Sequence, residues 1–171
     1  LLVAVANRKL PAGSSAVAVA IGRNALRLEC ARRLGPFLAP PLVHPRAVVS
    51  PGARLGVGTV VLAGTVVNSA AFVGEAVILN TACVIEHDCI IEDGVHVSPG
   101  AVLAGGVTLG KCAWIGAGAV VIPGVHIGAN AVVGAGGVVL RNVDDAVTVV
   151  GVPAKPLSGQ TLGGVPSSME S

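Results

Sequence analysis

The residues best suited to chemistry stand together in one short stretch of the chain. Four carboxylates and two histidines fall within residues 86–96, including the run Glu86-His87-Asp88 and, nine residues after the first histidine, His96. Neighbouring carboxylates favour the charged form of an imidazole and so raise its basicity. Such a histidine can take a proton from an attacking group near neutral pH. We predict that His87 is a general base supported by Asp88, with a solvated corner histidine as the alternative.

A repeat of six residues surrounds this stretch. Residues 47–142 divide into sixteen consecutive six-residue blocks without an insertion, and the third place of every block is Val, Leu or Ile. A period of six held over this length is typical of a hexapeptide β-helix. The composition agrees, because 53% of residues are hydrophobic while the chain has two Phe, one Trp and no Tyr. A narrow core of stacked aliphatic side chains has little room for rings.

The repeat predicts which residues lie above one another. Three blocks close one triangular coil of 18 residues, and successive coils stack at the strand spacing of about 4.8 Å. His87 falls at the fifth place of its block, which is a corner position, and Gly105 follows it by 18 residues. We therefore expect Gly105 one coil above His87. A rod of this kind commonly buries its flat faces against copies of itself.

Zinc is the competing chemistry, since histidines are its common ligands. The spacings between His87, His96 and His126 are nine and thirty residues, and neither superposes on an 18-residue coil. No close pair of histidines is available to begin a zinc site. We expect no metal, and a zinc-dependent hydratase stays a weaker alternative, as does a non-catalytic structural β-helix.

The remaining composition narrows partners and location. Residues 1–46 carry seven Arg or Lys against one Glu, which suits an anionic ligand. No aromatic interleaving or nucleic-acid motif accompanies this charge, so we expect no nucleic-acid partner. No stretch resembles a membrane span or a secretory leader. The four cysteines form no C-x-x-C pair, and we expect them to be reduced core residues of a cytoplasmic protein.

The front of the chain has a different pattern. Residues 16–21 predict a buried strand, Gly22 a turn, and Asn24 a cap for a helix over 25–34 that ends at Gly35-Pro36. Strand, glycine turn and helix are half of an α/β nucleotide-binding unit. The run Asn7-Arg8-Lys9 stands where a complete unit carries its glycine-rich phosphate loop. We expect a partial, Rossmann-like segment over 1–42, a β-helix over 43–157 and a polar tail over 158–171.

Several motifs taken together resemble a known family, the bacterial sialic-acid O-acetyltransferases and nucleotide-linked 4-amino-sugar N-acetyltransferases. The likeness runs from residue 16 to about 157, and its motifs are Ala20-Ile21-Gly22, Asn80-Thr81, Glu86-His87-Asp88-Cys89, His96-Val97-Ser98-Pro99-Gly100, Ala104-Gly105-Gly106, Trp114-Ile115-Gly116 and Gly151-Val152-Pro153-Ala154-Lys155. The resemblance implies a left-handed parallel β-helix that assembles as a homotrimer and holds acetyl-CoA between subunits.

The resemblance also implies roles for single residues. His87 matches the base and Asp88 the acid that raises its basicity. Acetyl-CoA would meet His96, the main chain of Gly105 and, in the same groove, Ala117 and His126. Gly22 and Asn80 match substrate-binding positions. A bare glycine at 105 would let a thioester approach the backbone, whose N–H could stabilise the oxyanion.

These expectations converge on one activity. We predict an acetyl-CoA-dependent acetyltransferase that acts on the amine of a nucleotide-linked amino sugar. The amine would attack directly with assistance from His87, and the protein would serve polysaccharide biosynthesis. O-acetylation of a sialic acid or another glycan sugar is the alternative, because the same base serves both acceptors.

Overall fold

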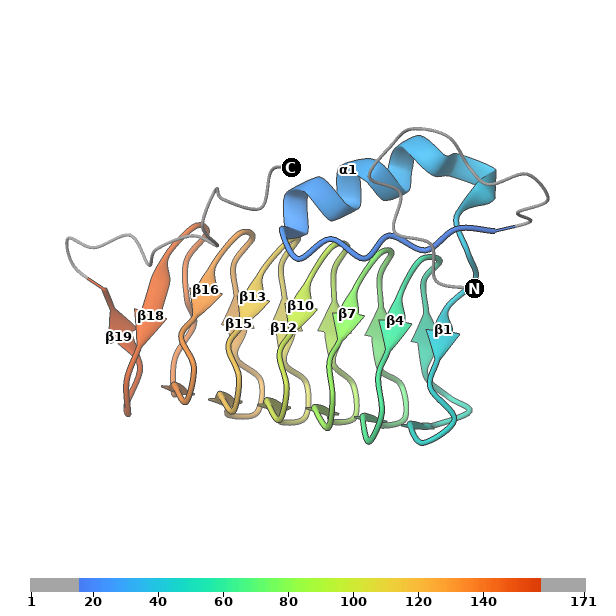
Figure 1. Ribbon diagram of the computed structural model, residues 1–171. Coiled ribbons are helices and arrows are strands. Elements are labelled where there is room, and N and C mark those ends of the chain that lie inside the picture. Colours follow the sequence, from blue (N-terminus) through green and yellow to red (C-terminus); the bar gives the residue numbers. More distant parts are fainter. Residues whose placement is uncertain (1–15, 158–171) are drawn as a thin grey trace.

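The computed structural model describes residues 16–157, and a rod of short strands makes up most of them (Figure 1). Each of the sixteen predicted blocks contributes one two-residue strand at its second and third places. These strands are β2 (Val48–Val49), β3 (Arg54–Leu55), β4 (Val60–Val61), β5 (Val66–Val67), β6 (Phe72–Val73), β7 (Ile78–Leu79), β8 (Val84–Ile85), β9 (Ile90–Ile91), β10 (His96–Val97), β11 (Val102–Leu103), β12 (Thr108–Leu109), β13 (Trp114–Ile115), β14 (Val120–Val121), β15 (His126–Ile127), β16 (Val132–Val133) and β17 (Val138–Val139).

Further strands extend the rod at both ends. β1 (Leu42–Val43) pairs with β4 before the first block, and β18 (Thr148–Val150) pairs with β16 after the last. β19 (Lys155–Pro156) then runs antiparallel to β18 and ends the described chain. All other pairings are parallel, which is the arrangement that a coil of fixed length produces.

Three sheets form the sides of the rod. The eight-stranded sheet has the order β1-β4-β7-β10-β13-β16-β18-β19, the six-stranded sheet β17-β14-β11-β8-β5-β2, and the five-stranded sheet β15-β12-β9-β6-β3. From β1 to β17 the paired residues are 18 apart, as in His96 with Trp114 and Val84 with Val102, whereas Val132 of β16 pairs with Thr148 of β18 at a spacing of 16. The predicted class is confirmed as a parallel β-helix, and a small helix lies in the segment before it that was expected to be a partial Rossmann-like unit.

The core is the stack of third-place side chains inside the rod. From Val61 to Val139 every one of them is at most 2% exposed, and small first-place residues fill the space between them. Cys83 and Cys89 belong to this filling, and both are free thiols. Burial raises the pKa of the Cys83 thiol to about 11, so this sulfur is not a ready nucleophile.

The sixth place of a block turns the chain into the next side. Glycine occupies many of these corners, and most of the others hold small or polar residues with positive φ, including Asp88 at 61°. An aspartate tolerates this left-handed conformation better than most residues do. The corner therefore directs the side chains of His87 and Asp88 outward together.

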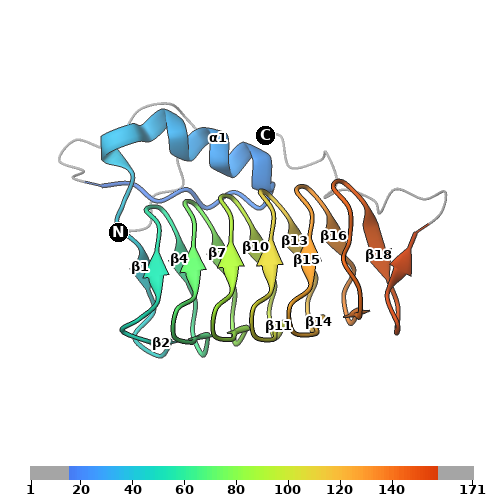
Figure 2. The same cartoon turned by 180° about the vertical axis from the view of Figure 1, so that it is seen from behind.

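The predicted helix is present as α1 (Asn24–Leu34), followed by the 3-10 turn η1 (Gly35–Phe37). It lies lengthwise along one edge of the rod, as both views show (Figures 1 and 2). Leu28 and Ala31 are buried against the corner between the five- and eight-stranded sheets. The predicted cap is wrong, because Arg23 is the N-cap residue and forms no side-chain cap bond. The Asn24 side chain is used elsewhere.

Asn24 and Arg27 fasten this helix to the rod. Asn24 Nδ2 donates to the carbonyls of Cys112 and Ala113 at 3.1 Å each. The guanidinium of Arg27, only 1% exposed, donates to the carbonyl oxygens of Ala76 at 2.8 Å and Gly94 at 2.7 Å. Desolvation lowers the pKa of Arg27 to about 10, yet the group stays cationic at neutral pH. The helix is thus held to three successive coils through their backbone oxygens.

The segment before the helix differs from its prediction. Residues 16–21 are extended but form a single parallel bridge, between Val17 and Leu38, and no named strand. Val17 and Ala18 are buried and Val19 packs against the cluster of Leu28 and Ala31, while Ala20 is exposed. A strand needs a partner along its length, and within residues 16–157 Leu38 supplies one residue of pairing. No helix in this part of the chain is long and apolar enough to cross a membrane.

Candidate active site

His87 lies at the corner between β8 of the six-stranded sheet and β9 of the five-stranded sheet. Its Nδ1 is 2.8 Å from Oδ2 of Asp88, and both side chains are about two thirds exposed. Glu86 does not share in this contact, because its carboxylate accepts from Asn68 Nδ2 at 2.8 Å. A carboxylate on Nδ1 holds the neutral ring with its proton on that atom. Nε2 is then free to accept a proton.

Gly105 lies one coil above, as the 18-residue spacing predicts. The Gly106 N–H donates to the carbonyl of His87 at 2.9 Å, which fixes the two corners against each other. A Cβ built on Gly105 would lie 2.6 Å from Cε1 and 2.7 Å from Nε2 of the imidazole. The space above this glycine is therefore filled by the His87 ring itself, and a side chain at 105 would collide with it. The Gly105 N–H donates to no acceptor within residues 16–157.

A second group of predicted residues lies on the eight-stranded sheet. His96 on β10 and Trp114 on β13 stack with ring centroids 6.2 Å apart and planes 10° from parallel. Trp114 Nε1 donates to Oγ of the buried Ser98 at 2.9 Å. Asn80, just after β7, has its Nδ2 3.1 Å from Nε2 of His96. Three successive coils thus build one half-buried polar wall.

The environment of His96 disfavours its charged form. Burial is the main cause and the positive charge of Arg27 the second, and together they lower the pKa of His96 to about 4. His96 is therefore neutral at pH 7. A general base works best when its pKa lies near the operating pH, and the lowered pKa of His96 does not meet that condition. The neutral ring is instead suited to a fixed hydrogen bond.

The predicted site residues fall into separate places on a single chain. The corner between the six- and five-stranded sheets holds His87, Asp88 and Gly105. The eight-stranded sheet, which is the side of the triangular rod opposite that corner, holds Asn80 and His96. Within residues 16–157 the other three form no hydrogen bond with either group: Ala117 lies at the corner between β13 and β14, His126 is exposed on β15 of the five-stranded sheet, and Gly22 precedes α1. Among the described residues no three His, Cys, Asp or Glu gather as a metal site.

Two contributors were not singled out from the sequence. Arg27 donates to the carbonyl of Val95, the residue before His96, at 3.2 Å. The sequence could have indicated this role, because Arg27 lies four residues before the buried Ala31 and so on the same face of the helix. Ser98 supports the ring of Trp114 from 16 residues earlier in the chain. That offset is not a multiple of 18, so the coil periodicity could not indicate it.

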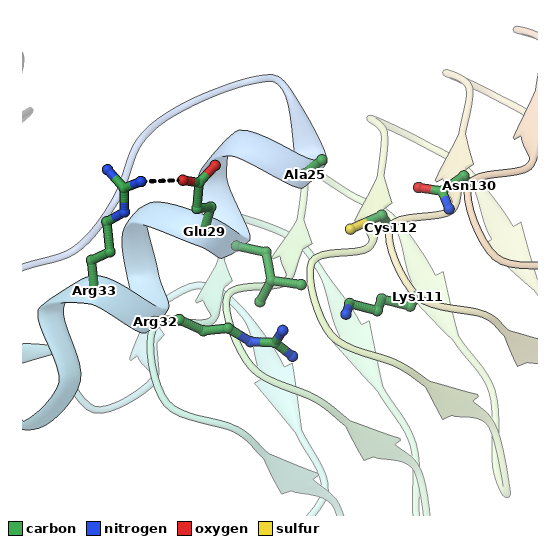
Figure 3. A pocket seen from close by; sticks show the side chains of 8 residues that line it. Ala25, Glu29, Arg32, Arg33, Lys111, Cys112 and Asn130 are labelled. Carbon is green, nitrogen blue, oxygen red and sulfur yellow. Dashed lines mark hydrogen bonds and ion pairs between the residues drawn. The ribbon is translucent and has the colours of Figure 1, made fainter.

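A hollow of about 540 Å³ lies beside α1, apart from both groups (Figure 3). Arg32 pairs there with Asp93 at 3.2 Å and Arg33 pairs with Glu29. None of the predicted site residues contributes to it, so its position does not identify the chemistry. Its lining consists of Ala25, Leu28, Glu29, Arg32, Arg33, Lys111, Cys112 and Asn130.

Comparison with protein families agrees with this architecture. Residues 106–141 match the family described as bacterial transferase hexapeptide (six repeats). A search of the curated proteins found no match.

Solved structures give a closer comparison. A perosamine N-acetyltransferase from Caulobacter crescentus, in complex with CoA and GDP-perosamine, is 47% identical over 85% of this chain and 70% of its own, with a TM-score of 0.82. The acetyltransferase domain of PglB from Neisseria gonorrhoeae, in complex with acetyl coenzyme A, is 42% identical over 83% of this chain and 70% of its own, with a TM-score of 0.80. WeeI from Acinetobacter baumannii is 32% identical over 86% and 73%, also with a TM-score of 0.80.

Identity at this level over 83% or more of the chain reaches well beyond residues 106–141, which the repeat model matches. The chain is an acyltransferase and belongs to the family of hexapeptide-repeat sugar N-acetyltransferases that use acetyl-CoA.

Proposed function

We propose that the protein transfers the acetyl group of acetyl-CoA to the amine of a nucleotide-linked amino sugar. The observation that carries the proposal is the His87 corner, where Asp88 binds Nδ1 and Nε2 lies against the backbone of Gly105. An imidazole held in this way can accept a proton, and a glycine N–H beside it can meet a developing oxyanion. The related perosamine N-acetyltransferase was solved in complex with CoA and GDP-perosamine.

The proposed reaction is one direct displacement. The amine nitrogen attacks the thioester carbon, and His87 Nε2 takes a proton from that nitrogen. The carbonyl electron pair moves onto oxygen, where the Gly105 N–H stabilises it. The tetrahedral species then collapses, the C–S bond breaks, and the departing sulfur takes the proton from His87. The acetyl group ends on nitrogen and CoA leaves as its thiol. Asp88 keeps the ring in the productive tautomer throughout.

The separate positions of the two residue groups support a shared active site. His87 and His96 lie on opposite sides of one rod, so a site that uses both needs two copies of the chain. An interface that joins a corner of one copy to the opposite side of the next is heterologous, and such contacts close only as rings. A two-fold dimer could not bring these patches together. We propose the homotrimer that the family resemblance implies.

The outer surface of the six-stranded sheet supports the same assembly. Its outward residues are all valine, namely Val48, Val66, Val84, Val102, Val120 and Val138. Val48 is 64% and Val120 36% exposed in the single chain. A continuous apolar strip of this length is typical of a surface covered by a partner. It borders the His87 corner, so covering it would bring a second subunit to the base.

The remaining expected residues complete the proposal. We assign His96, Ala117 and His126 to acetyl-CoA, and Gly22 and Asn80 to the sugar acceptor. Gly22 is joined to the rod through Arg27, which donates to its carbonyl at 3.4 Å. We also propose that the protein is cytoplasmic and serves polysaccharide biosynthesis, since nucleotide-linked sugars are substrates of that process.

A thiol-release assay tests the function. Purified protein is incubated with acetyl-CoA and a panel of amino sugars, free and nucleotide-linked, with the matching hydroxyl sugars as controls. We expect CoA release only with 4-amino sugars, with much higher kcat/KM for the nucleotide-linked forms, and N-acetylated product by mass spectrometry. Release with hydroxyl sugars alone would replace the proposal by O-acetylation. No release with any acceptor would contradict acetyl transfer to sugars.

A further inference from the structure

Asn80 and His96 form a contact whose polarity can be assigned from their neighbours. Asn80 Oδ1 accepts from the backbone N–H of Thr81 at 2.8 Å, which fixes the orientation of the side-chain amide. The Nδ2 group therefore faces His96, 3.1 Å from its Nε2. An amide NH₂ only donates, so Nε2 must accept. A neutral imidazole with an accepting Nε2 carries its hydrogen on Nδ1.

The ring is also held in one orientation. It stacks almost parallel to Trp114, and Trp114 is itself fixed by its bond to Ser98. On the inner side Arg27 binds the carbonyl of Val95, the residue before His96. Rotation of the imidazole by a half turn would exchange Nε2 for Cε1, so a C–H would face the Asn80 amide and the hydrogen bond would be lost.

The other ring nitrogen faces outward. No hydrogen bond of His96 Nδ1 is formed within residues 16–157, and no side-chain nitrogen in this range is both fully buried and unpaired. Nδ1 therefore reaches the surface of the wall as an unused donor. A protonated ring is disfavoured by burial, by Arg27 and by the absence of any carboxylate ion pair with His96 in the described chain.

We propose that Asn80 locks His96 as the neutral Nδ1–H tautomer, so that His96 presents one fixed donor to a carbonyl oxygen of the acyl donor. Asn80 is thus a positioning residue that acts through His96, and its second amide hydrogen stays available to the acceptor sugar. The carbonyl is that of the thioester or of a pantetheine amide, and this assignment rests on the proposed acetyl transfer. The two histidines then have different roles, because His87 accepts a proton at Nε2 whereas His96 donates a hydrogen bond from Nδ1.

The tautomer is measured directly by long-range ¹H–¹⁵N correlation of the imidazoles in the full chain at pH 7. The protein has four histidines, and His96→Gln identifies the signal. We expect a pyrrole-type Nδ1 and a pyridine-type Nε2 for His96. Asn80→Asp replaces the donor by an acceptor and should convert the ring to the Nε2–H or cationic form. Asn142→Asp is the control, because the oxygen of Asn142 accepts from the backbone N–H of His126 and an aspartate oxygen can keep that bond.

Kinetics provide the second readout. We expect Asn80→Asp to raise KM for acetyl-CoA by about tenfold, the effect of one lost or reversed hydrogen bond, with little change in melting temperature. His96→Asn keeps a donor near the position of Nδ1 and should retain more activity than His96→Gln. An Nε2–H or cationic His96 in the wild type overturns the proposal, as does greater activity in His96→Gln. The Nδ1–H tautomer in a protein that transfers no acetyl group contradicts the proposed function instead and leaves the lock standing.

Discussion

Replacing Gly105 by alanine is the sharpest local test of the His87 corner. A Cβ at this position would lie 2.6 Å from Cε1 of the imidazole, whereas ordinary contact begins at 3.4 Å, so the ring must move by about 0.8 Å. His87 is exposed and can swing into solvent without disturbing the core. A displacement of this size at a reacting group costs about 100-fold in rate. We expect kcat to fall by that factor while the free energy of unfolding stays nearly unchanged.

The assay is thiol release at saturating acetyl-CoA and acceptor, together with thermal unfolding of the same sample. Gly52→Ala is the matched control, because it lies on the same corner line and its added Cβ would meet neighbours only at 3.6 Å or more. Gly105→Ala with kcat within threefold of wild type would refute the reasoning that the imidazole position over this glycine matters. A large loss of stability would show that the corner, and not the ring, absorbs the collision.

The remaining predictions concern the two histidines. His87→Ala should lower kcat by ~10²–10⁴-fold through loss of the base, with a melting temperature close to wild type because the side chain is exposed; activity within a few-fold of wild type would remove His87 from the mechanism. Because the pKa of His96 falls from 6.5 to about 4 on folding, the unfolded chain binds an extra proton between these values, so its contribution to stability is complete above pH 6.5 and is lost as pH falls towards 4. Urea unfolding should show a flatter pH dependence over that window in His96→Gln, and identical curves would contradict a buried neutral ring.

The periodic features of this protein could be predicted from its sequence. Each block forms one short strand that ends at its aliphatic third place, and the 18-residue offset puts Gly105 above His87, because both follow from backbone geometry alone. Contacts that depend on side-chain reach could not be predicted in this way. Asn80 meets His96 at an offset of 16, because its side chain reaches back to the start of β10 and not to Ser98, the residue 18 positions on.

The front segment was the least predictable part. A capping pattern assigned Asn24 to the helix start, but the carbonyls of a coil 88 residues away are its partners. Arg27 is one of the basic residues of the front segment that were expected to suit an anionic ligand, whereas backbone oxygens of the rod accept its hydrogen bonds. Local pattern cannot anticipate either contact, because both depend on where the helix docks. The strand expected over residues 16–21 forms one bridge, because its partner, Leu38, lies beyond the helix and its position depends on the tertiary structure.

The most direct test of a shared acetyl-transfer site is a hybrid assembly of two impaired variants. His87→Ala and His96→Ala are co-expressed with different tags, and trimers that carry both are purified on the two tags in turn. In a ring of three, every hybrid has one interface where an intact His87 meets an intact His96, so we predict about one third of wild-type activity per trimer. With acetyl-CoA below its KM, His87→Ala alone should be nearly inactive and His96→Ala alone should keep about a tenth of wild-type activity. Hybrids no more active than their parents would contradict a site built from the His87 corner of one subunit and the His96 wall of the next.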